Sequence, residues 1–110
     1  SSGERAKVIN AKPPQLVAAL TMYPTSDGGR KSIAAPGFGC PCFPTKDARA
    51  STAYDGWPIL GDQSISPGET RRVGFWFTSE EAPGIMRRAG TFYLWDGRFI
   101  GEAVVLSEIA

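Results

Sequence analysis

The stretch TFYLWDGRFIGEAVVL, residues 91–106, carries the strongest fold signal in the chain. Two runs of β-forming residues, 92–95 and 98–100, flank the pair Asp96-Gly97. Aspartate-glycine between such runs predicts a β-hairpin with a two-residue primed turn, which needs positive φ at both central positions. Gly101, in the returning strand, predicts a bulge or a close approach of another backbone.

Alternating apolar residues outside the hairpin predict further strands. Residues 15–23 place Leu16, Ala18, Leu20 and Met22 on one face. Residues 71–77 alternate in the same way, with Val73, Phe75 and Phe77 on one side and Arg72, Gly74 and Trp76 on the other. Residues 53–59 can form another strand, and 40–44 an extended segment. Between these segments, Pro67-Gly68 suits the centre of a type II turn.

These segments predict one all-β domain. Residues 79–90 allow at most one helical turn, because Pro83-Gly84 interrupts them. Residues 1–14 are polar with a double proline and predict a flexible arm or linker, so we assign the domain to residues 15–110. Five to seven short strands favour a small closed antiparallel β-barrel of about six strands, since closure removes exposed strand edges.

Composition excludes several function classes. The 110 residues include 12 Lys and Arg against 11 Asp and Glu, so net charge predicts no attraction to nucleic acids or membranes. The absence of histidine removes Ser-His-Asp and Cys-His sites. No apolar run approaches the length of a membrane span and no signal peptide is visible, so we expect a cytoplasmic protein.

The segment DGGRKS, residues 27–32, invites comparison with a phosphate-binding loop. It lacks the required spacing, and Pro36-Gly37 blocks the helix that should follow. We therefore interpret Gly28 and Gly29 as residues of a sharp turn. Arg30 and Lys31 are not explained by the turn, and they are either solvated or in contact with a phosphate.

Cys40 and Cys42 are too few to bind zinc without histidine. Alternation places both thiols on one side of a strand, which favours two buried, small apolar side chains. Redox chemistry and an intermolecular metal site stay open as alternatives. Glu80, Glu81 and Glu102 form no evident acid–base pair, so we expect no catalytic residue, no metal and no cofactor.

The remaining basic residues include Arg71, Arg72, Arg87 and Arg88. They could converge with Arg30, Lys31 and Arg98 on a phosphate. Interspersed acidic residues favour ordinary mixed surface charge instead.

The order of these motifs resembles the C-terminal β-barrel, domain 3, of elongation factor Tu, over residues 12–109. The likeness rests on the strand followed by DGGRK, the Gly-aromatic-X-X-Pro-X-Phe stretch at residues 37–43, the SPGE turn with the strand after it, and the closing WDGRFIGEAVVL. It implies a six-stranded barrel in which Arg30 matches an arginine that approaches the RNA backbone. Gly97, Arg98 and Gly101 match the closing hairpin, whose turn also lies near RNA.

The chain also departs from that family. Cys40-Pro41-Cys42-Phe43 replaces Arg-Pro-Gln-Phe, so two polar side chains of the RNA-facing segment are missing. Asp96 adds an acid where RNA would approach. No phosphate loop occurs, so we expect no GTP hydrolysis.

We therefore predict a stand-alone, non-catalytic binding module whose partner is another protein, with Trp76, Trp57 or Trp95 as interface anchors. The alternative is an RNA-binding, translation-associated accessory protein that uses Arg30, Lys31 and Arg98. An enzyme using Cys40 or Cys42 ranks last, and the oligomeric state stays open.

Overall fold

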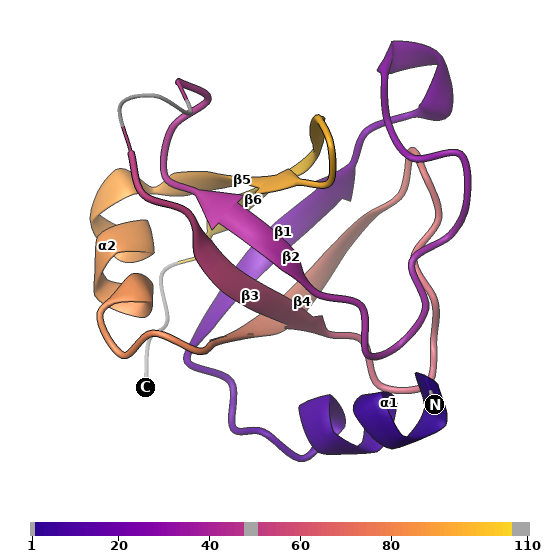
Figure 1. The fold of residues 1–110 in the computed structure, drawn as a ribbon, viewed down its shortest axis with the longest axis horizontal. Coiled ribbons are helices and arrows are strands. Elements are labelled where there is room, and N and C mark those ends of the chain that lie inside the picture. The colour runs from indigo at the N-terminus through magenta and orange to yellow at the C-terminus, as the bar shows by residue number, and fades with distance from the viewer. Residues whose placement is uncertain (1, 48–50, 107–110) are drawn as a thin grey trace.

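The computed structural model describes residues 2–47 and 51–106, and its centre is a closed barrel of six antiparallel strands (Figure 1). The strands are β1 (Leu16–Met22), β2 (Cys40–Phe43), β3 (Tyr54–Ile59), β4 (Thr70–Phe77), β5 (Thr91–Trp95) and β6 (Phe99–Val105). Their order around the barrel is β1-β4-β3-β2-β5-β6. The predicted small, closed, all-β barrel of about six strands is confirmed.

Every second residue of the longer strands faces the barrel interior, as the alternation predicted. β1 buries Leu16, Ala18, Leu20 and Met22, and β4 buries Val73, Phe75 and Phe77. The Phe92 ring packs edge-on against Phe75 and Phe77, with ring centroids 5.0 and 5.7 Å apart. The barrel is therefore filled by its own side chains.

Helix α2 (Ala82–Ala89) lies on one side of the barrel, opposite the loop that carries the short 3-10 helix η1 (Thr25–Asp27; Figure 1). It is longer than the single turn predicted from Pro83-Gly84. Proline at the start of a helix costs little, because the first N–H groups have no intrahelical partner. Pro83 and Met86 are buried against the barrel, so packing stabilises a helix that the sequence alone disfavours.

The N-terminal residues form helix α1 (Ser2–Asn10), which lies against one side of the barrel (Figure 1). Ile9 is only 4% exposed. The Asn10 side chain donates a hydrogen bond to the Gly61 carbonyl (2.7 Å) and accepts one from the Gly61 N–H (3.1 Å). The sequence predicted a flexible arm over residues 1–14, whereas the structure places residues 2–10 in a short polar helix that these contacts hold against the barrel.

The β5–β6 hairpin is confirmed, but its predicted two-residue turn is wrong. Trp95 pairs with Phe99, which leaves Asp96, Gly97 and Arg98 in the loop, and the register shifts between Leu94 and Trp95. Gly97 has φ +75°, whereas no described non-glycine residue has positive φ. A three-residue loop with one glycine in the left-handed region is the next commonest hairpin connection.

Two other glycine-related predictions agree with the structure. Gly68 has φ +86°, and the Glu69 N–H donates to the Ser66 carbonyl at 3.0 Å across the Pro67-Gly68 turn. A Cβ on Gly101 would lie 2.8 Å from the Thr21 carbonyl oxygen, so the absence of a side chain at Gly101 permits the close approach of β1 and β6 there.

Within residues 2–47 and 51–106, neither helix has the length and hydropathy that a membrane span requires.

Candidate functional site

The Asp27-Gly28-Gly29 segment is a turn, as predicted. Gly28 ends η1 with φ +90°, in the left-handed region that favours glycine. Gly29 is needed for a different reason, because a Cβ there would lie 1.9 Å from the Tyr23 carbonyl oxygen. Both glycines thus serve the backbone, and neither marks a phosphate site.

Arg30 is held by contacts within the protein. Its guanidinium lies 4.5 Å from the centroid of the Phe38 ring, and Nη2 donates to the Ser32 hydroxyl at 3.4 Å. Nη1 lies 4.0 Å from the Asp96 carboxylate. The side chain is 21% exposed, and Nη1 is buried without a hydrogen-bond partner among the described residues. Arg30 therefore presents little of its charge to a ligand.

The Arg30–Asp96 contact brings the double-glycine turn next to the β5–β6 loop. Lys31, Gly97 and Arg98 are exposed, so three of the predicted binding residues are accessible. Trp76 is not part of this group, because β4 lies three strands away from β5 around the barrel. The structure thus divides the predicted site residues between two regions of the surface.

Four aromatic side chains form a cluster on the outside of β2, β5 and β6, and we call it the aromatic face: Phe43, Tyr93, Trp95 and Phe99. The strand register assembles it, because Phe43 pairs with Tyr93 and Trp95 pairs with Phe99. The Phe99 ring makes edge-on contacts with the rings of the other three, at centroid distances of 4.9 to 6.0 Å. All four residues are partly exposed.

Polar and charged groups border the aromatic face. The Tyr23 hydroxyl donates to Glu102 Oε1 at 2.8 Å, and Glu102 lies opposite Tyr93 across β5 and β6. Burial, together with this hydrogen bond, raises the pKa of Tyr23. Lys46 Nζ lies 5.1 Å from the Tyr23 ring centroid and 5.4 Å from that of Tyr93.

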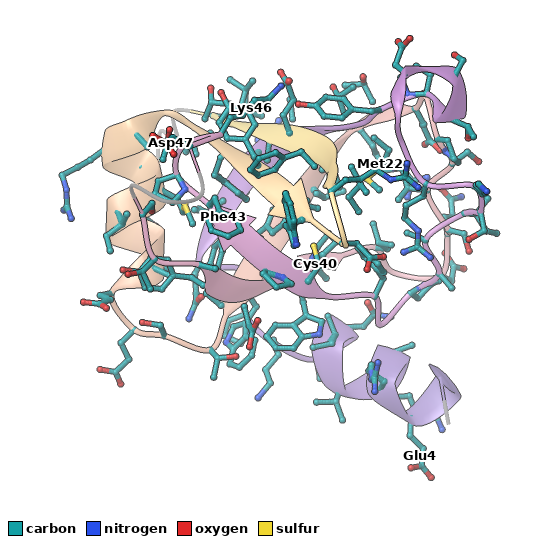
Figure 2. All side chains as sticks on the ribbon, turned by 45° about the horizontal axis from the view of Figure 1, so that its top comes forward. Glu4, Met22, Cys40, Phe43, Lys46 and Asp47 are labelled. Carbon is teal, nitrogen blue, oxygen red and sulfur yellow. The ribbon has the colours of Figure 1, made fainter. Side chains whose placement is uncertain are left out.

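Figure 2 shows Phe43 and Lys46 far from Glu4 of α1. The side of the barrel that carries the aromatic face is therefore not the side that α1 covers.

A second aromatic pair lies on β3 and β4. Trp57 and Trp76 are direct cross-strand neighbours, with ring centroids 5.6 Å apart and planes inclined by 45°. Both are partly exposed. Lys12 Nζ lies 4.5 Å from the Trp76 ring centroid, so the chain leaving α1 already covers part of this pair.

The remaining chemical groups offer little reactivity. Cys40 and Cys42 face the barrel interior as free thiols, with Cys42 fully buried. The interaction with the neighbouring Cys40 thiol, together with burial, raises the pKa of the Cys42 thiol, so the nucleophilic thiolate is disfavoured. In the described part of the chain, no three His, Cys, Asp or Glu side chains are grouped as metal ligands would be.

Sequence reasoning identified Trp95 but missed Phe43, Tyr93 and Phe99 as members of one surface. A partial signal was present, since Tyr93 and Trp95 are two residues apart and therefore share a face of their strand. Phe43 could not be added without knowing that β2 pairs with β5, a contact between segments about fifty residues apart.

No protein-family model matches the chain, and comparison with curated proteins finds no significant match.

Proposed function

We propose that this barrel is a non-catalytic binding module of the type found in domain 3 of elongation factor Tu, and that it binds another protein through the aromatic face. The observation that carries the proposal is the cluster of four partly exposed, mutually packed rings on the outside of a barrel whose interior is already full. Trp and Tyr are strongly enriched among the residues that dominate protein–protein affinity.

The surroundings of the aromatic face also suit a protein partner. Protein interfaces combine an aromatic, charge-poor centre with a polar rim. Here Lys46 and Glu102 border the rings, and Asp96 and Arg98 lie in the adjoining loop. We infer a partner that contributes apolar side chains to the centre and charges of both signs around it.

Catalysis is a weaker explanation of the same surface. The thiols face the interior and the pKa of Cys42 is raised. Glu102, which lies opposite Tyr93, is hydrogen-bonded to Tyr23 rather than paired with a second acid. A binding role needs none of these groups to react.

RNA binding is the less favoured alternative. Arg30 should make the central phosphate contact, but its guanidinium group already contacts Phe38, Ser32 and Asp96. Lys31 and Arg98 are accessible, but the Asp96 carboxylate would repel a phosphate at the same loop.

The test compares proteins captured by the wild type with those captured by Trp95→Ala and Phe99→Ala. Ile33→Ala, which alters an exposed apolar residue of a different loop, is the matched control. We expect a protein that binds the wild type and the control but is lost with both aromatic variants. The purified partner should then bind directly in calorimetry, at least about tenfold more weakly to Trp95→Ala.

Two results would oppose the proposal. If the aromatic variants captured the partner as well as the wild type does, the docking site would lie elsewhere on the surface. Loss of capture after ribonuclease treatment, or direct tRNA binding that Lys31→Ala and Arg98→Ala weaken, would favour the RNA-binding alternative.

A further inference from the structure

A pocket of about 520 Å³ lies between α1 and the outer face of β3 and β4. Its volume falls in the range of small-molecule sites. One wall is the Trp57–Trp76 pair, and the other is the face of α1 that carries Arg5, Val8 and Ile9, followed by Lys12. This pocket is separate from the aromatic face, which lies on β2, β5 and β6.

The tryptophan wall favours a flat, apolar ligand. The two indole rings are neighbours across β3 and β4, and both keep some exposed surface. Trp57 can occupy its position only because residue 39 is glycine, since a Cβ there would lie 2.1 Å from the Trp57 Nε1 atom. Aromatic rings pack well against indoles in offset or edge-on geometry.

The charged groups of the pocket are all cations. Arg5 and Lys12 line it, and no carboxylate does. Neither cation has an ion-pair partner among residues 2–47 and 51–106. The Lys12 ammonium group instead lies over the Trp76 ring. A carboxylate could bind this ammonium group alongside the ring or in place of it.

Val8 is an apolar side chain left uncovered at the pocket. It is 55% exposed, whereas the adjacent Ile9 is almost fully buried against the barrel. A ligand with an apolar body would cover Val8 and gain the free energy of removing that surface from water.

From these features we propose that the pocket binds a small aromatic carboxylate, with its ring system against Trp57 and Trp76 and its carboxylate at Lys12 or Arg5. The site is independent of the proposed protein-binding function, because it uses different strands and different side chains. The tryptophan wall selects the flat body, and the two cations Arg5 and Lys12 select its negative charge.

The probe for this proposal is 2-naphthoate, measured by calorimetry and by amide chemical shifts. We expect saturable binding whose shifts concentrate on α1, β3 and β4. The uncharged analogue 2-naphthamide, which has the same ring system, should bind about fivefold more weakly or worse, and added salt should weaken only the carboxylate.

Two variants test the two halves of the site. Trp76→Ala should lower the affinity about tenfold or more, and Lys12→Gln, which removes the charge but keeps a polar side chain, about threefold to tenfold. Trp95→Ala and Lys31→Gln are the matched controls, and neither should change the affinity. Lys12 is partly exposed on the outside of the barrel, so Lys12→Gln should fold and remains informative if Trp76→Ala does not fold.

The proposal is overturned by absence of saturable binding at millimolar 2-naphthoate. It is also overturned if 2-naphthamide binds equally well, or if Trp95→Ala and Trp76→Ala weaken binding alike. The last result would place the ligand on the aromatic face, and it would leave the protein-partner experiment unaffected.

Discussion

At the scale of single residues, glycines and one arginine decide the shape of the surface near the β5–β6 loop. Gly29 permits a backbone contact that any other residue would prevent. Arg30 then turns inward onto Phe38 and links the turn to Asp96. An arginine that looks available for phosphate in the sequence is thus mostly a structural residue, and the exposed Lys31 beside it keeps its charge in solvent.

Gly29→Ala should lower the free energy of unfolding by about 3 kcal/mol or more, because the new Cβ would collide with the Tyr23 backbone, which cannot move aside cheaply. Gly28→Ala is the matched comparison: nothing lies within 4 Å of its Cβ, so only the positive φ is penalised, at about 1 kcal/mol. Urea unfolding of both variants measures the difference. Equal losses would show that backbone conformation, rather than close approach, explains Gly29.

At the scale of elements, the two helices pack on the outside of a barrel that the six strands form. α2 buries Pro83 and Met86, and α1 buries Ile9. Neither helix would be stable alone, since isolated helices of this length are marginal in water. Their order therefore depends on docking, and α1 in turn forms one wall of the pocket over Trp57 and Trp76.

Asn10→Ala should loosen α1 while leaving the barrel folded. It removes two hydrogen bonds to the Gly61 backbone and should lower the free energy of docking by about 1–2 kcal/mol. Amide hydrogen exchange should accelerate in residues 5–12 and stay unchanged in β1 and β4. Lys7→Ala, an exposed position of the same helix, is the control. If the α1 amides already exchange freely in the wild type, the N-terminal residues behave as the flexible arm that their sequence suggested.

At the scale of the whole molecule, closure of the barrel separates a packed interior from an outer surface that carries two aromatic clusters. The interior holds the phenylalanine cluster and both thiols, and reaching it requires the barrel to open. The outer surface carries the aromatic face on one side and the Trp57–Trp76 pair on the other. A ligand that does not open the barrel can reach only its outside, which includes these two aromatic surfaces and the exposed Lys31 and Arg98.

Thiol labelling should therefore report global unfolding. At neutral pH, Cys40 and Cys42 should react with a thiol reagent at least about a hundredfold more slowly than Ile33→Cys, which places a thiol on an exposed loop. Urea should accelerate labelling of the native thiols in parallel with the loss of β-sheet signal. Fast labelling of either native cysteine in the folded protein would restore the hypothesis of a reactive thiol.

The raised pKa of Cys42 also gives the sign of a pH effect. Because the folded state favours the neutral thiol, the stabilisation is fully present below the unfolded-state pKa of about 8.5 and is lost as the pH rises towards the folded-state value. The wild type should therefore lose more stability than Cys42→Ala between neutral and alkaline pH.

The amino-acid sequence by itself determined the strands, the inward face of each long strand and the hairpin, because alternation and turn chemistry act between near neighbours. It also fixed the roles of Gly28, Gly68 and Gly97, whose positive φ is a local requirement. Only the tertiary structure decided that α1 docks, that α2 extends beyond one turn, and that the hairpin loop has three residues. It alone assembled the aromatic face and turned Arg30 inward, because those outcomes depend on pairing between segments far apart in the chain.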